Sequence, residues 1–181
     1  GMELFKTSSS IGSWEYPGDA IFMIGNVPLF SGFMYAAVGS YIARAWRVLD
    51  LQFTNYPNRA LTILLSLAIY INFFTHHYII DVRLVLFLAT FVLFYKTWVS
   101  YKLVAARRRM PLLVSFLLIA LFIWVAENIG TITSTWLYPE QVDGWQLVSL
   151  QKLGSWYLLM IISFVMIEVL NHYRQTRKKS P

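Results

Sequence analysis

Long apolar segments joined by short polar connections make up most of this sequence. A helix needs roughly 20 apolar residues to cross about 30 Å of hydrocarbon. Five segments approach that length, and we expect membrane spans at approximately 20–46, 60–80, 84–101, 111–129 and 153–170. The connections leave no room for a second domain. The sequence therefore predicts an all-α fold, a polytopic transmembrane helix bundle that forms a single integral membrane domain over residues 1–181.

The composition agrees with this prediction. Of the 181 residues, 57% are hydrophobic and only 13% are charged, whereas a soluble domain carries about 25% charged residues. So few charges cannot cover a globule with hydrated surface, which argues against a soluble enzyme and against a disordered chain. The chain has no cysteine, so disulfides, thiolate metal sites and cysteine nucleophiles are excluded.

Basic residues gather in or beside alternate connections, those that follow the first, third and fifth expected spans. The exceptions are Lys6, Arg83 and Lys152. The positive-inside rule then predicts a multi-pass protein of the bacterial inner membrane, with the basic tail 171–181 in the cytoplasm and the residue 1 end outside. The same distribution explains the net charge of +6. It predicts membrane lipid, and not nucleic acid, as the partner. Nothing in the sequence indicates an oligomeric state.

The first residues suggest a missing upstream segment. The chain opens on Gly1, and an extracytoplasmic start with no signal peptide ahead of it is unusual. We therefore expect this sequence to be the C-terminal part of a longer protein with further spans.

Two segments resemble each other and predict an internal repeat. Both contain Trp-x-Tyr-Pro, with a glutamate 11 residues before the tryptophan in the first and 9 residues before it in the second. Repeats are common in membrane folds, and the functional site often lies at their interface. The aromatic residues are expected either in a belt at the headgroup level or around a cavity for an apolar ligand. The residues are Glu3, Trp14, Tyr16 and Pro17 in the first segment, and Glu127, Trp136, Tyr138 and Pro139 in the second.

The remaining unusual polar residues fall on the same outer side. A carboxylate in hydrocarbon is costly and usually faces the bundle interior with a partner, which makes Glu127 the strongest candidate. His76 is its expected partner, and Asn72 shares a helical face with His76 because the two are four residues apart. We predict Glu127 and His76 as catalytic residues, or else as a pair that only fixes helix packing. The predicted ligand-binding residues are Asn72, Asn128, Trp14, Tyr16, Trp136 and Tyr138.

No metal and no cofactor are expected. His76 and His77 are adjacent, so one helix cannot easily direct both at one ion, and His172 lies on the other side. The sequence also has no Gly-x-Ser-x-Gly, no phosphate-binding loop and no His-Glu-x-x-His.

Several strings resemble one bacterial integral membrane family, domain of unknown function 817, the YoaT-like proteins. The likeness covers nearly the whole chain. Members are typically longer at the N-terminus, and the family has no established activity, so the resemblance implies a class and not a reaction. The strings are Gly12-Ser-Trp-Glu-Tyr-Pro, Val27-Pro-Leu-Phe-Ser-Gly-Phe-Met-Tyr-Ala-Ala-Val-Gly-Ser-Tyr-Ile, Asn72-Phe-Phe-Thr-His-His, Trp124-Val-Ala-Glu-Asn-Ile and Lys152-Leu-Gly-Ser-Trp.

A second likeness is one of pattern alone. Carotenoid-biosynthesis membrane proteins, including small lycopene cyclase domains, also place an acidic residue at a helix end before a Gly, Trp or Tyr loop. Their Pro-x-Glu-Glu signature is absent, since no acid follows Pro28 in Val27-Pro-Leu-Phe.

Three functions therefore stay open. The first is binding of, or reaction with, an apolar, isoprenoid-type lipid at an outer-side intramembrane site, where a buried carboxylate can protonate a double bond without a cofactor. The second is a small transporter with a proton relay through Asn72, His76 and Glu127. The third is a non-catalytic structural subunit. The sequence does not decide whether the protein is an enzyme.

Overall fold

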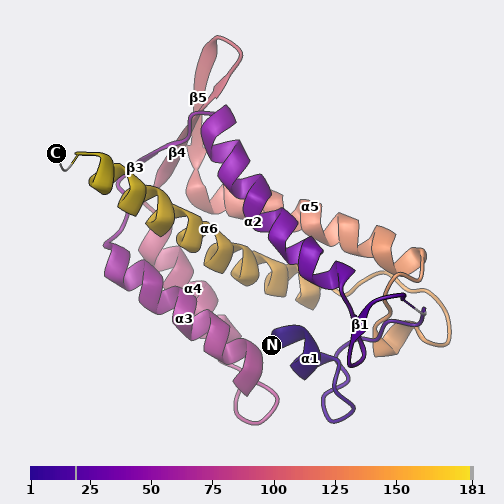
Figure 1. The fold of residues 1–181 in the computed structure, drawn as a ribbon. Coiled ribbons are helices and arrows are strands. Elements are labelled where there is room, and N and C mark those ends of the chain that lie inside the picture. The colour runs from indigo at the N-terminus through magenta and orange to yellow at the C-terminus, as the bar shows by residue number, and fades with distance from the viewer. Residues whose placement is uncertain (19, 180–181) are drawn as a thin grey trace.

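The computed structural model describes residues 1–18 and 20–179 (Figure 1). Residues 180–181 of the expected basic tail lie outside them. The helices of the described part are α1 (Met2–Lys6), α2 (Phe30–Val48), α3 (Arg59–Thr75), α4 (Arg83–Phe94), α5 (Leu112–Ile132), α6 (Leu150–Lys179) and the short 3-10 helix η1 (Pro139–Gln141). The strands are β1 (Met23–Ile24), β2 (Val27–Pro28), β3 (Gln52–Thr54), β4 (Trp98–Leu103) and β5 (Ala106–Pro111).

The prediction of an all-α bundle with about five membrane spans is wrong. Among the described helices, only α5 and α6 are long and apolar enough to cross a membrane. Helices α3 and α4 have 17 and 12 residues, or about 25 and 18 Å at 1.5 Å per residue, which is short of about 30 Å of hydrocarbon. Helix α2 starts ten residues later than the expected span because the preceding segment forms the β1–β2 hairpin around Gly25 (φ 61°).

Strands replace the end of the third expected span. The apolar segment is helical only to Phe94, and Trp98–Leu103 pairs with β3 on one side and β5 on the other. In this antiparallel sheet Val99 lies opposite both Phe53 and Met110. Val99 is buried in the core, so the sheet is anchored to the helices while its hairpin projects beyond them (Figure 1).

Helix α6 is the central element, since it packs against α2, α3 and α5. Its Phe164 lies among the rings of Trp46, Phe53 and Phe116, at centroid distances of 5.7, 5.4 and 5.0 Å. Buried Glu168, one turn further along α6, pairs with Arg59 at 3.0 Å. Aromatic packing and this ion pair thus fill the molecule on the side of the sheet.

The opposite end is built differently. Helix α1, the ends of α3 and α5, and the starts of α2 and α6 meet there (Figure 1), and they surround a cavity. The basic β5 strand and the end of α6 lie at the sheet end. The molecule therefore has a basic end, which is packed, and an end that holds a cavity.

The β4–β5 hairpin offers a test of local backbone strain. Val104, at its tip, has φ 53°, a left-handed conformation that a β-branched residue adopts only at a cost. We expect Val104→Gly to raise the free energy of unfolding by about 1 kcal/mol, measured by thermal unfolding in detergent. Ala105→Gly is the control, because Ala105 is outside the left-handed region and should not gain stability. Equal effects of the two substitutions would contradict the strain.

Candidate functional site

A cavity of about 380 Å³ lies at the end opposite the sheet. Six of the eight candidate residues line it, although they come from four separate parts of the chain. The first repeat segment, the end of α3, the end of α5 and the second repeat segment each contribute. The six are Trp14, Tyr16, His76, Glu127, Trp136 and Tyr138.

Each repeat places a glutamate against its own aromatic residues. The Glu3 carboxylate accepts hydrogen bonds from the Trp14 indole at 3.3 Å and from the Tyr16 hydroxyl at 2.9 Å. The Glu127 carboxylate, which is buried, accepts from the Tyr138 hydroxyl. Burial, and then the Glu3 charge, raise the pKa of Tyr16 above its ordinary value, so this hydroxyl stays protonated and keeps donating.

The two repeat segments also pair with each other. Glu15 and Leu137, the variable residues of the two Trp-x-Tyr-Pro motifs, exchange two backbone hydrogen bonds of 2.9 Å in an antiparallel bridge. An antiparallel pair has a local two-fold axis, so the two motifs face the cavity in related orientations. A buried threonine, Thr7 or Thr131, also follows each glutamate by four residues, a correspondence that a closer comparison of the two segments would have found.

Gly130 makes the second motif possible. A β-carbon at this position would lie 2.2 Å from the ring of Trp136, well inside any allowed contact. The indole therefore lies directly on the backbone of α5, three residues after Glu127. This close approach holds Trp136 at the cavity wall.

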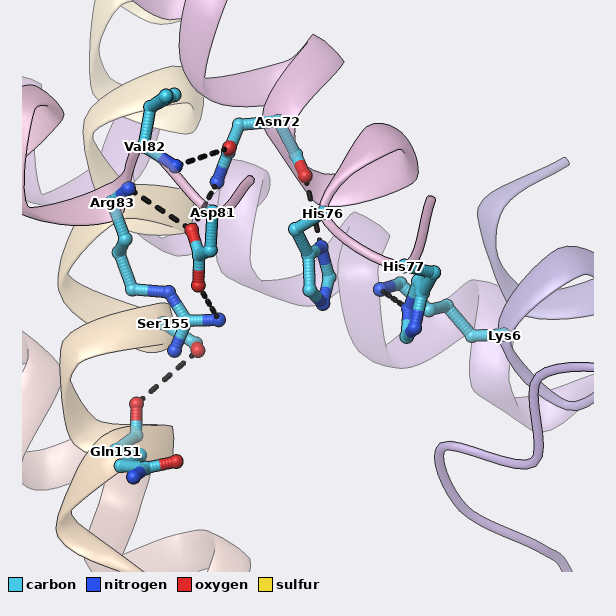
Figure 2. A network of polar contacts seen from close by, with 9 residues as sticks. All are labelled: Lys6, Asn72, His76, His77, Asp81, Val82, Arg83, Gln151 and Ser155. Atoms are coloured by element: carbon cyan, nitrogen blue, oxygen red, sulfur yellow. Dashed lines mark hydrogen bonds and ion pairs between the residues drawn. The ribbon is translucent and has the colours of Figure 1, made fainter. Parts of the chain in front are cut away.

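The two asparagines do not line the cavity. Asn72 donates to Asp81 at 3.1 Å and accepts from the Val82 amide at 3.2 Å, so it fixes the connection from α3 to α4 (Figure 2). Asn128 donates to the Trp124 carbonyl at 2.8 Å and accepts from the Val148 amide at 3.0 Å. Both side chains hold connecting segments against helices.

His76 lines the cavity, but the described contacts of Glu127 do not include it. Its Nδ1–H donates to the Asn72 carbonyl at 2.9 Å (Figure 2). The adjacent His77 accepts instead, from the Lys6 ammonium, at 2.7 Å. Burial, followed by the charge of Lys6, lowers the pKa of His77 to about 4, so the ring is neutral at ordinary pH.

The cationic residues of the cavity were not among the predicted site residues; they are Lys6, Arg83 and Lys152. They are the same residues that depart from the basic distribution along the chain, which was a usable signal. Lys6 is only 4% exposed. Burial, then the charges of Lys152 and Arg83, lower its pKa to about 8.

The described residues contain no group of three or more His, Cys, Asp or Glu side chains placed to hold a metal ion. The side chains that line the cavity carry carboxylates, phenols, indoles, imidazoles, ammonium groups and the Arg83 guanidinium.

Comparison with known proteins places the chain in a family. A family model described as "Protein of unknown function (DUF817)" matches residues 1–164. The chain belongs to this DUF817 family. It is also 47% identical over 180 residues to "Uncharacterized protein YoaT" of Bacillus subtilis (strain 168), an alignment that covers 99% of this chain and 66% of that protein. The chain thus spans just under two thirds of this relative. No solved structure matches it, and the pattern likeness to carotenoid-biosynthesis proteins stays a prediction.

In this DUF817 chain, a methyl group added at Gly130 would clash with the Trp136 ring at the cavity wall. We expect Gly130→Ala to displace the Trp136 indole and to lower the free energy of unfolding by about 1–3 kcal/mol. Near-ultraviolet circular dichroism would report the indole, and thermal unfolding would report stability. Gly32→Ala is the control, since a β-carbon there meets nothing within 4 Å and should be neutral or slightly stabilising. A Gly130→Ala protein with unchanged dichroism would contradict the close approach.

The lowered pKa of Lys6 has a consequence for stability. Between about 8 in the folded chain and 10.5 in the unfolded chain, the unfolded state binds more protons, so stability rises with pH across that window. Asp81 opposes the shift. Between about pH 7 and pH 10 we expect the free energy of unfolding of wild type to rise by about 1–2 kcal/mol more than that of Lys6→Met. Denaturation at each pH measures both. Lys102→Met, at an exposed strand position, should parallel wild type. If the free energy of unfolding of Lys6→Met changes with pH as that of wild type does, the lowered pKa of Lys6 is refuted.

Proposed function

We propose that this DUF817 chain is embedded in a membrane and binds an apolar, isoprenoid-type lipid in the cavity at its extracytoplasmic end. One observation carries the proposal. Both repeats present a glutamate with hydrogen-bonded aromatic side chains to one cavity. Aromatic faces suit flat, unsaturated hydrocarbon, and convergent polar groups orient a ligand in its pocket.

The exposure of the apolar helices supports embedding. Only 22% of the most apolar window of α5, and 33% of that of α6, is buried inside the molecule, whereas a soluble core helix is mostly buried. Large apolar side chains on α3, α4 and α5 are also exposed, over a surface that water would penalise. Examples are Leu64, Leu67, Ile71, Leu84, Leu88, Phe91, Leu117, Leu121 and Phe122.

Charge supports the orientation. Lysines and arginines near apolar helices favour the cytoplasmic side, and the sheet end carries Arg107, Arg108 and Arg109 on β5. We therefore infer that the sheet and the C-terminal part of α6 face the cytoplasm. The cavity then opens near the outer surface.

Glu127 has two possible roles with such a ligand. As an anchor, its carboxylate would accept a hydrogen bond from a ligand hydroxyl. As an acid, it would transfer its proton to a carbon–carbon double bond, leaving a carbocation on the ligand and a carboxylate on Glu127. The Trp136 and Trp156 rings at the cavity would stabilise that cation through their faces.

The other two interpretations have less support. A proton relay would use Asn72 together with His76 and Glu127, but Asn72 is engaged with the α3–α4 connection. A purely structural subunit would not require a cavity lined by so many polar groups.

Orientation can be tested with single cysteines, because the chain has none of its own. We expect Val142→Cys, exposed in the α5–α6 connection, to react with an impermeant maleimide in intact cells. Val104→Cys, at the exposed hairpin tip, should react only after the cells are opened. The reverse pattern would refute the proposed orientation.

Ligand binding can be tested with farnesol and the purified protein in nanodiscs, followed by quenching of tryptophan fluorescence. We expect Glu127→Gln and Tyr138→Phe each to weaken binding about tenfold, since each removes a buried polar partner. Glu15→Gln is the matched control, because its side chain is exposed and only its backbone joins the bridge. Glu127→Gln that binds like wild type would favour the structural interpretation.

A further inference from the structure

The cations of the cavity end have unusual partners. All three described ion pairs of the chain involve arginine, and Arg83 pairs with Asp81 at 3.0 Å. Neither Lys6 nor Lys152 lies within 4.0 Å of a carboxylate among the described residues. The Lys6 ammonium instead donates to the neutral His77 ring, which supplies no compensating charge.

Lys152 joins the two repeats. Its ammonium lies 3.9 Å above the Tyr138 ring centroid and 5.9 Å from that of Trp14, so one ring comes from each Trp-x-Tyr-Pro motif. Aromatic faces stabilise a cation without neutralising it. Two ammonium groups without a contacting carboxylate therefore face one cavity, from α1 and from the start of α6. Carboxylates act on them only over longer distances: Glu127 and Glu140 on Lys152, and Asp81 on Lys6.

The carboxylates of the cavity do not cancel these charges by direct contact. Glu3 accepts from Trp14 and Tyr16, and Glu127 accepts from Tyr138. Glu140 is exposed at the rim. An incoming anion would thus meet ammonium groups whose hydrogens are not committed to carboxylates.

A second cavity of about 280 Å³ adjoins the first. The two share Met2, Trp156 and Leu159 in their walls. The rest of the second lining is almost wholly apolar and belongs to α2, α3, α5 and α6, with Val38, Gly39, Ile123, Met160, Met166 and Ile167 among its residues. A polar cavity that carries two ammonium groups therefore lies beside an apolar one.

We propose that the ligand is an amphiphile whose phosphate-type anionic headgroup binds between Lys6 and Lys152 and whose prenyl chain occupies the second cavity. This inference rests on the proposed function and names its substrate class. Lysine binds phosphate oxygens as a point charge through several donors, and the apolar lining of the second cavity favours a hydrocarbon chain. Arg83 adds positive charge at the rim, while its pairing with Asp81 keeps it from being the main contact.

The headgroup is tested by comparing farnesyl phosphate, farnesol and inorganic phosphate with the full chain in nanodiscs. We expect farnesyl phosphate to bind about tenfold more tightly than farnesol, and Lys6→Met or Lys152→Met to lower this ratio of affinities towards one. Lys102→Met, which removes an exposed charge at the sheet end, should retain it. Thermal unfolding checks that each variant is folded.

The possible outcomes separate the two proposals. Equal affinity for farnesyl phosphate and farnesol, with no effect of either lysine substitution, would overturn the headgroup site but leave the proposal of lipid binding intact. If inorganic phosphate binds as tightly as farnesyl phosphate, the site binds free anions, and the proposal of an amphiphilic ligand is overturned. Failure of both prenyl compounds to bind would overturn the proposed function together with this inference.

The position of the prenyl chain has its own test, which leaves both lysines unchanged. A β-carbon at Gly39 meets nothing within 4 Å, so Gly39→Phe should partly fill the second cavity without disturbing the headgroup site. We expect this substitution to weaken binding of geranylgeranyl phosphate about fivefold more than binding of geranyl phosphate. Gly32→Phe, on the same helix but outside both linings, should leave the ratio unchanged. An unchanged ratio for Gly39→Phe would refute chain binding in the second cavity.

Discussion

The backbone pairing of Glu15 with Leu137 is the contact on which the cavity depends. It joins segments that lie more than a hundred residues apart in sequence. Each segment carries aromatic side chains that turn toward a glutamate on a nearby helix. The bridge thus helps to bring Trp14 and Tyr138, one ring from each motif, close to Lys152.

The distribution of charge follows from the same arrangement. The packed end of the molecule uses aromatic rings around Phe164 and a buried Arg59–Glu168 pair. At the cavity end the buried Lys6 ammonium donates to a neutral imidazole instead of a carboxylate, and burial of a charge is costly. The lowered pKa of Lys6 expresses that cost. Such unfavourable arrangements concentrate at functional sites.

Sequence reasoning recovered the polar cluster better than it recovered the fold. Glutamate near an apolar helix end and a repeated aromatic motif carry chemical information, and Glu127, His76, Trp14 and Tyr138 do line one cavity. Hydropathy carries no information on where a helix stops. It merged the β1–β2 hairpin with α2, and it merged β4 with α4, because apolar strand residues such as Val99 resemble helix residues in composition. Asn72 and Asn128 are not in the lining, which sequence alone could not show because an amide bonds equally well to a ligand or to a neighbouring turn.

Helix α1 has only five residues, yet it supplies Met2, Glu3 and Lys6 to the cavity wall. The Lys6–His77 hydrogen bond, contact of Phe5 with Phe74, and a hydrogen bond from Asn26 to the Thr7 carbonyl hold it in place. The wall of the cavity on this side therefore depends on contacts that α1 makes with the end of α3 and with the β1–β2 turn. The aromatic core around Phe164 takes no part in forming it.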